Sequence, residues 1–154
     1  MPKLSVLVLA VMIIVFHCGV SASGDARKRG RRSVLQFSQM VRCATGRSAL
    51  WDYNGYGCWC GVGGRGTPVD GTDRCCKVHD ECYDGIKRDC SESPYWTNYR
   101  YSKYNCESGS PWITCDDGWN SCKRRLCECD RQAALCFAKQ SFNSRYRSYS
   151  NANC

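Results

Sequence analysis

The hydrophobic residues of this chain form one continuous run near its start and shorter, periodic patterns after it. Residues 4–16 are almost entirely apolar, follow Lys3 and precede the small residues of the segment 20–22, Val-Ser-Ala. A transmembrane helix needs about 20 apolar residues, so this run is too short to span a membrane. The pattern predicts a signal peptide over residues 1–22, and we expect a secreted, extracellular protein without a transmembrane segment.

Three later segments are predicted to form helices, namely residues 33–42, 72–88 and 121–139, and the first of them has apolar residues at i, i+3 and i+7. Asp70 or Thr72 is expected to cap the second of these helices, because their side-chain oxygens can accept from free backbone N–H groups. The positions expected to face the core are Val34, Phe37 and Val41 in the first helix and Ala133, Ala134 and Phe137 in the third.

The segment just before the first helix is strongly basic. Residues 23–32 contain five basic residues and one acidic residue, and they predict a basic propeptide that is cleaved after Arg32. Residues 1–32 hold six of the 22 Lys and Arg and one of the 14 Asp and Glu, which leaves 16 and 13. Cleavage therefore lowers the net charge from +8 to +3, so the basic character belongs mainly to the part removed.

Residues 91–117 mix aromatic residues, Thr and Ile with Gly, Pro and Asn. Such a composition predicts a small two-stranded β-wing closed by turns. The polar tail, residues 141–154, has no apolar periodicity, and we expect Cys154 to tie it to the rest of the fold. Residues 33–154 are therefore predicted to form one mainly α domain.

Cysteine is the most unusual feature of the composition. Of the 15 cysteines, Cys18 lies in the predicted signal peptide and 14 lie in residues 33–154. An even number at this density is typical of disulfide scaffolds in exported proteins. We expect seven disulfide bonds, and the spacing alone leaves their connectivity open.

The candidate chemistry is concentrated in residues 57–83. His79 is the only histidine outside the predicted signal peptide, and imidazole is the side chain best suited to proton transfer near neutral pH. Asp80 follows it directly, and a glycine-rich loop, residues 61–66, lies upstream. Ca²⁺ readily accepts loop carbonyls and a carboxylate as ligands, whereas Mg²⁺ prefers a stricter octahedron. This stretch therefore predicts a calcium site.

Two other interpretations of this stretch are rejected. Residues 61–66 match G-x-G-x-x-G, but a dinucleotide fingerprint requires an apolar strand before it, and residues 51–56 read WDYNGY. The cysteines near His79 have the arrangement of zinc ligands, but an exported protein favours disulfides over thiolate ligands. The chain also lacks G-x-S-x-G, the signature of a serine nucleophile.

Three motifs carry a specific resemblance to a known family. Residues 56–64, YGCWCGVGG, resemble the calcium loop of the secreted calcium-dependent phospholipases A2, and residues 73–83, DRCCKVHDECY, resemble their active-site helix. Residues 127–131, CECDR, resemble a further C-x-C-D segment. The likeness runs from about Ser33 to Cys154 and is to group I, the pancreatic and elapid-venom type. It implies a disulfide-rich fold with two long antiparallel helices, an N-terminal helix, a calcium-binding loop and a β-wing.

The resemblance also implies a disulfide pattern that uses all 14 remaining cysteines. The implied pairs are Cys43–Cys106, Cys58–Cys154, Cys60–Cys76, Cys75–Cys136, Cys82–Cys129, Cys90–Cys122 and Cys115–Cys127. The two pairs between the long helices both have residue numbers that sum to 211, as antiparallel helices in constant register require. In this register His79 lies level with Gln132, so Asp130 is about 3 Å further along the facing helix.

The same resemblance implies the roles of individual residues. The implied calcium ligands are the carbonyl oxygens of Trp59, Gly61 and Gly63 and the carboxylate of Asp80. His79 would act as the general base, Asp130 would orient it, and the Gly61 N–H would hold the oxyanion. Tyr83 and Tyr99 are expected to hydrogen-bond to Asp130.

The implied function is calcium-dependent hydrolysis of the sn-2 acyl ester of glycerophospholipids by water, which releases a fatty acid and a lysophospholipid. The implied partner is a phospholipid aggregate or membrane surface, bound peripherally, and no nucleic acid. The family usually has Tyr where Trp59 stands, and with Trp51 this indole either inserts at the lipid boundary or packs against the protein.

Two other function classes are kept as alternatives. The first is a catalytically weak phospholipase scaffold that serves as a toxin or receptor-binding module, although Asp80 argues against it. The second is a disulfide-rich structural or inhibitory protein, which leaves the combination of His79, Asp80 and the glycine loop unexplained.

Overall fold

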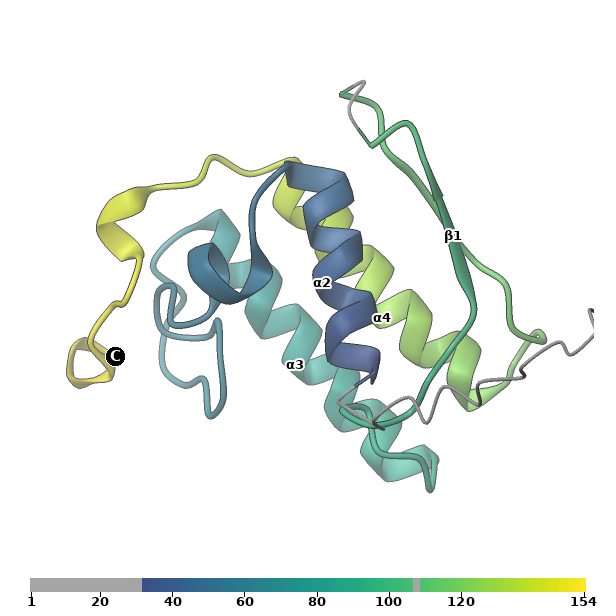
Figure 1. The fold of residues 1–154 in the computed structure, drawn as a ribbon. Helices are drawn as coiled ribbons and strands as arrows, with labels where there is room; N and C mark the ends of the chain where they lie inside the picture. Colours follow the sequence, from purple (N-terminus) through teal and green to yellow (C-terminus); the bar gives the residue numbers. More distant parts are fainter. Residues whose placement is uncertain (1–31, 107–108) are drawn as a thin grey trace, which may run out of the picture.

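A computed structural model describes residues 32–106 and 109–154 of the chain. Its elements are α2 (Arg32–Thr45), η1 (Ala49–Tyr53), α3 (Gly71–Asp89), β1 (Tyr101–Tyr104), β2 (Trp112–Cys115), α4 (Cys122–Ala138), η2 (Ser144–Tyr146) and η3 (Asn151–Asn153). Figure 1 shows α3 and α4 as long neighbouring helices, with α2 packed beside α4 and the strands at the edge of the molecule. The predicted mainly α fold with a two-stranded wing is confirmed. The predicted signal peptide and nearly all of the predicted propeptide lie outside the described residues.

The two long helices begin at residues with capping side chains. The Asp70 carboxylate accepts a hydrogen bond from the backbone N–H of Asp73 at 2.8 Å, and the Ser121 hydroxyl accepts one from Arg124 at 3.1 Å. Thr72, the other predicted cap of α3, lies inside the helix and is buried. Each cap satisfies one of the N–H groups that a helix start leaves without a partner.

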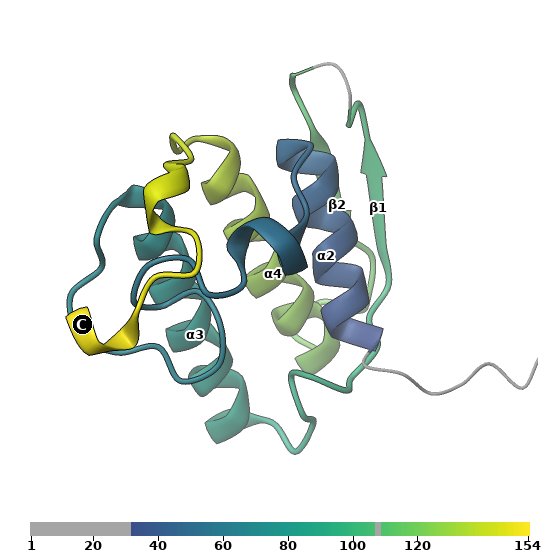
Figure 2. The same ribbon diagram turned by 60° about the vertical axis from the view of Figure 1, so that its left-hand side comes forward.

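Seven disulfides are present in the described residues, and every pair agrees with the connectivity that the resemblance implied. Two of them cross-link α3 with α4 in the predicted register. Cys58–Cys154 holds the C-terminal tail against the loop before α3, where Figure 2 shows the two segments side by side. Each bond typically contributes about 2–4 kcal/mol to stability.

Helix α2 extends further than the sequence pattern indicated. The prediction ended it at Arg42, but the helix continues to Thr45. Cys43 is buried and takes part in a disulfide, so its side chain belongs to the packed face of the helix. Gly46 follows the last helical residue, with a φ of 71° that suits glycine and an N–H that donates to the Arg42 carbonyl at 2.9 Å.

The core lies where α2, α3 and α4 meet. The stripe predicted on α4 is buried, with Ala133, Ala134 and Phe137 at most 4% exposed. Val41 of α2 is also fully buried, whereas Phe37 is only partly covered. The β-wing is antiparallel, with Tyr101 opposite Cys115. No helix in residues 32–106 and 109–154 has the length and apolar character needed to cross a membrane.

Candidate active site

The imidazole of His79 on α3 faces the carboxylate of Asp130 on α4. His79 Nε2 lies 2.7 Å from Asp130 Oδ1. The Asp130 side chain is completely buried and that of His79 is 11% exposed. Because a carboxylate accepts hydrogen bonds, this contact assigns the proton to Nε2 and leaves a lone pair on Nδ1. Nδ1 has no hydrogen-bond partner in the described part of the chain, so it is available to a water molecule.

Two phenols complete the surroundings of the buried carboxylate. The Tyr83 hydroxyl donates to Asp130 Oδ1 at 2.7 Å, and the Tyr99 hydroxyl donates to Oδ2 at 2.5 Å. Burial, together with the adjacent Asp130 charge, raises the pKa of both phenols above the usual value. Both therefore remain neutral donors, and the buried Asp130 carboxylate takes part in three hydrogen bonds.

Aromatic rings fix the orientation of the imidazole. Phe37 from α2 stacks on the His79 ring, with centroids 4.5 Å apart and planes 21° apart. The Tyr83 ring lies 4.2 Å away on a tilt of 50°. The contact of Phe37 with His79 was not predicted, because its spacing showed only that Phe37 faces inward. Which residue it meets depends on how α2 is placed on the other two helices.

The loop before α3 is held by a buried acid. The Asp73 carboxylate is fully buried and accepts backbone hydrogen bonds from Cys58, Trp59 and Val69 at 2.8, 2.7 and 2.9 Å. A Cβ on Gly57 would lie 2.4 Å from the carboxylate carbon of Asp73, so only glycine fits there. Asp73 therefore positions the loop, a role that its place in the helix motif did not reveal.

The loop carbonyls divide into two sets. Those of Cys58 and Cys60 accept backbone hydrogen bonds of 3.1 and 2.6 Å. Those of Trp59, Gly61 and Gly63, the predicted ligands, accept none from the described residues. A hard cation that coordinates oxygen can use carbonyls of this second kind.

Asp80 has the character expected of a metal ligand. Its side chain is half-buried and has no hydrogen-bond donor among residues 32–106 and 109–154. Burial raises its pKa to about 6, although the neighbouring His79 acts in the opposite direction. A desolvated carboxylate without a donor is costly in free energy, and a divalent cation would offset that cost. Asp80 and the three free carbonyls thus fit calcium.

The two tryptophans near the loop differ in their environments. The Trp59 indole N–H donates to the Gly66 carbonyl at 3.0 Å, and the Lys77 ammonium lies 5.3 Å from the ring centroid. Trp59 is partly buried against the core, so the packing interpretation holds for it. Trp51 is 82% exposed and remains free to meet another surface.

A family model described as phospholipase A2 matches residues 34–147. This chain belongs to the phospholipase A2 family. Similar proteins include "Phospholipase A2" from Bos taurus, which is 41% identical over 96% of this chain and 98% of its own length. "Phospholipase A2, membrane associated" from Cavia porcellus is 48% identical over 77% and 79%, and "Basic phospholipase A2" from Micrurus corallinus is 43% identical over 79% and 81%.

The chain is accordingly an enzyme of the phospholipase A2 family, whose reaction is the hydrolysis of phospholipids and whose members are generally calcium-dependent. Among the predicted site residues of this phospholipase, His79, Asp130, Tyr83 and Tyr99 form one hydrogen-bonded group. In the described chain no hydrogen bond connects Gly61 to this group.

Proposed function

We propose that this chain hydrolyses the sn-2 acyl ester of glycerophospholipids at a lipid surface, with water activated by His79 and with Ca²⁺ as cofactor. The observation that carries the proposal is the bond of 2.7 Å between His79 and the buried Asp130. A charged carboxylate that holds one imidazole nitrogen, and leaves the other free, is the arrangement of a general base.

The proton chemistry follows from these contacts. Water bound at His79 Nδ1 transfers a proton to that nitrogen as its oxygen attacks the ester carbonyl. Asp130 keeps the proton of the neutral imidazole on Nε2 and stabilises the imidazolium that forms. The imidazolium then returns its Nδ1 proton to the departing glycerol oxygen as the ester C–O bond breaks. The phenols of Tyr83 and Tyr99 hold the carboxylate in place. General base catalysis of this kind is worth about 10²–10⁴-fold in rate.

The negative charge of the phosphate, and the negative charge that develops on the ester carbonyl oxygen during attack, must be stabilised by a positive charge. Trp59, Gly61 and Gly63 would hold Ca²⁺ with their carbonyls, and Asp80 would hold it with its carboxylate. The chemistry that bound Ca²⁺ supplies is stabilisation of negative charge on the ester and phosphate oxygens. The Gly61 N–H donates to no described residue, so it is available to the oxyanion. One such donor is worth about 10²–10³-fold in rate.

Exposed apolar side chains offer a contact with lipid. Leu35 on α2, Trp51 on η1 and Val62 in the loop are 56%, 82% and 98% exposed. Indole and aliphatic side chains gain free energy when they enter the boundary between water and acyl chains. We propose that these residues contact the phospholipid aggregate peripherally.

Export and processing belong to the same proposal. We propose that residues 1–22 direct secretion and that residues 23–32 are then removed, which leaves residues 33–154 as the enzyme. The Ser33 side chain is fully buried, and its hydroxyl donates to the Pro94 carbonyl at 2.7 Å. N-terminal sequencing of the secreted protein should begin at Ser33. A secreted form that starts at residue 23 would show that the basic segment is retained.

The function is tested on phosphatidylcholine vesicles that carry a labelled acyl chain at either the sn-1 or the sn-2 position. Labelled fatty acid should appear only from the sn-2 set, and only with Ca²⁺ present. Release from the sn-1 set at the same rate would contradict the proposed position of cleavage. Vesicle binding without release from either set would favour the alternative of a binding module.

A further inference from the structure

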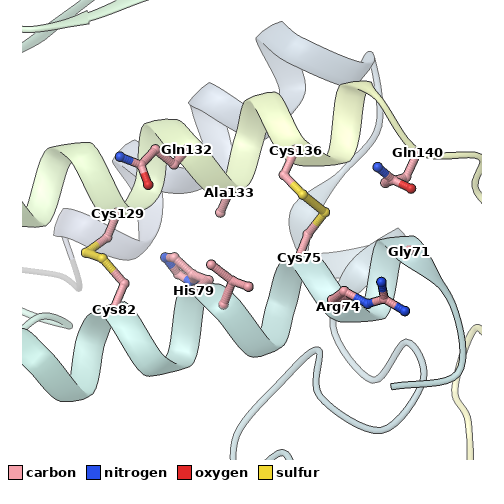
Figure 3. A pocket seen from close by; sticks show the side chains of 11 residues that line it. Gly71, Arg74, Cys75, His79, Cys82, Cys129, Gln132, Ala133, Cys136 and Gln140 are labelled. Atoms are coloured by element: carbon pink, nitrogen blue, oxygen red, sulfur yellow. A yellow bond between two sulfur atoms is a disulfide. The ribbon is translucent and has the colours of Figure 1, made fainter. Parts of the chain in front are cut away.

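A groove made of two adjoining cavities follows the line where α3 and α4 meet, on the side that faces away from α2. Two cavities of about 200 and 600 Å³ lie along it and share Cys82, Cys129 and Gln132 in their linings. In Figure 3 α2 lies behind α4, and the smaller cavity faces the viewer. From Cys136 near one end to Arg125 near the other, the rise of an α-helix gives a length of about 17 Å along α4.

The smaller cavity is apolar. Figure 3 shows it between the two disulfides that bridge the helices, with Ala133 and His79 at its centre. Val78 also lines it and is 53% exposed, and Arg74 is the only Lys, Arg, Asp or Glu among the lining residues described. The disulfide sulfurs, Val78 and Ala133 make this end of the groove mainly apolar, although the amides of Gln132 and Gln140 also line it.

The larger cavity is cationic. Glu128 accepts hydrogen bonds from the Nε atoms of Arg124 and Arg131 at 3.0 and 2.7 Å, so two guanidinium groups share one carboxylate. The terminal nitrogens of both arginines donate to no described residue. Arg124 also lies 5.2 Å from the ring centroid of Trp119, which is 80% exposed. Arginine forks with free donors recognise carboxylates and phosphates.

We propose that this groove binds a single-chain anionic amphiphile, specifically a long-chain fatty acid. The carboxylate would accept from Arg124 and Arg131, and the chain would cross the Cys82–Cys129 disulfide into the apolar cavity at Val78. A neutral lipid would leave the arginines without an anion, and a short carboxylate would leave the apolar cavity in water. The mechanism proposed for hydrolysis uses none of these arginines.

The choice of a fatty acid as the ligand rests on the proposed function in one respect, because a fatty acid is one product of that reaction. Binding to the groove requires neither Ca²⁺ nor turnover. It can therefore be measured in EDTA, where hydrolysis does not contribute, and failure of one proposal leaves the other standing.

The first experiment uses three probes and titration calorimetry on the intact protein in EDTA. Dodecanoate below its micellar concentration should bind at one site. Butyrate lacks the long apolar chain and dodecyltrimethylammonium lacks the carboxylate, so both should bind roughly tenfold more weakly or worse. Equal affinity for dodecanoate and dodecyltrimethylammonium would overturn the proposal, since the arginines would then have no role.

The second experiment locates the site with matched variants. The triple variant R124Q/E128Q/R131Q removes two positive charges and one negative charge from the cationic end, a net loss of one positive charge. Because Glu128 is replaced together with both arginines, no carboxylate is left without its partners. The control R145Q removes one positive charge from an exposed position in the C-terminal tail. We expect dodecanoate affinity to fall roughly tenfold in the triple variant and to stay unchanged in R145Q. Equal loss in both would indicate a general charge effect and contradict the site.

V78D and L35D test the apolar end. Both residues are exposed to a similar degree, at 53% and 56%, but Val78 lines the groove and Leu35 lies on α2. Weaker dodecanoate binding in V78D alone supports the groove, and weaker binding in L35D alone places the fatty acid near α2 and overturns the proposal. This pair decides the matter even if the triple variant folds poorly.

Discussion

The indole N–H of Trp59 donates to the backbone carbonyl of Gly66, and this bond of 3.0 Å spans the glycine loop. A Cβ on Gly64 would lie 3.0 Å from an atom of the Trp59 ring, so the loop backbone runs directly over the indole. The side chain therefore fixes the shape of a loop whose carbonyls are the proposed calcium ligands. The indole of Trp59 acts on the loop, while Trp51 is available to lipid.

The first prediction compares these two tryptophans. Trp59→Phe keeps an aromatic ring but removes the indole N–H, and with it a hydrogen bond worth about 0.5–1.5 kcal/mol, so Ca²⁺ affinity should fall about two- to tenfold. Trp51→Phe should leave Ca²⁺ affinity unchanged, and Trp51→Ala should weaken binding to vesicles. Calcium calorimetry and vesicle sedimentation measure the two effects separately. If Trp59→Phe weakened vesicle binding but not calcium binding, Trp59 would contact lipid and would not shape the calcium loop.

The second prediction concerns the metal ligand set. Asp80→Asn retains one oxygen ligand and should weaken Ca²⁺ binding, whereas Asp80→Lys places an ammonium at the site and should abolish it. Both variants should keep the thermal stability of the calcium-free protein, because Asp80 has no hydrogen-bond donor among the described residues. Mg²⁺ should not restore hydrolysis, since flexible carbonyls do not provide a strict octahedron. Equal rates with Mg²⁺ alone would contradict the calcium assignment.

The third prediction tests the acid that holds the loop. Asp73→Ala leaves the backbone N–H groups of Cys58, Trp59 and Val69 buried without an acceptor, at a cost of about 3–5 kcal/mol in stability. The measurement is urea unfolding with the disulfides intact. Asp89→Asn is the matched control, because Asp89 is an exposed acid whose bond to Arg125 is open to solvent, and it should change stability little. Similar effects of both substitutions would refute the special role of Asp73.

The sequence predicted the framework of the site better than the contacts that orient it. The helices carrying His79 and Asp130 were expected from capping residues, the family motifs and an apolar stripe on the second helix. The register between their implied disulfides placed the two side chains within reach. The disulfide connectivity came from family resemblance, because spacing alone cannot choose among the pairings. These features repeat along the chain or belong to motifs, so they can be read before the fold is known.

The supporting contacts depend on how distant segments pack. From the sequence, Asp73 could be recognised only as a member of the helix motif. Its hydrogen bonds to the loop amides exist because the loop folds back over the start of α3. Phe37 was one member of an apolar stripe, and only the position of α2 brings it to His79. The extension of α2 to Thr45 was missed because the prediction stopped at a polar residue before the buried Cys43. Side-chain partners of this kind are set by three-dimensional packing, which periodicity does not specify.

The fourth prediction is a loss of stability at high pH. Burial, and then the hydrogen bond to Asp70, raises the pKa of Tyr56 to about 12, above the value near 10 of an unfolded tyrosine. The folded state thus favours the neutral phenol, so this contribution to stability is complete below pH 10 and is lost as the pH rises towards 12. Tyrosinate absorbance and circular dichroism should change together in this window. The free energy of unfolding of the Tyr56→Phe variant should fall less steeply with pH in this window. A pH dependence identical to that of the wild type would exclude Tyr56 as a contributor.

The fifth prediction concerns the general base. His79→Gln should fold normally and bind Ca²⁺ with wild-type affinity, because the imidazole is not among the proposed ligands. Its sn-2 hydrolysis should fall by about 10²–10⁴-fold, since no other imidazole exists in residues 33–154 to accept the proton of water. Calcium calorimetry and initial rates on vesicles give the two measurements.

Asp130→Asn provides the graded comparison for this prediction. An asparagine oxygen can still accept from His79 and Tyr83, while its amide group can donate to the Tyr99 hydroxyl, so the geometry around the imidazole is retained. What is lost is the negative charge that stabilises the imidazolium, and the rate should therefore fall less than in His79→Gln. If His79→Gln kept substantial calcium-dependent hydrolysis while Asp130→Asn did not, His79 would not be the base. The buried carboxylate would then act on water by a route that does not pass through the imidazole.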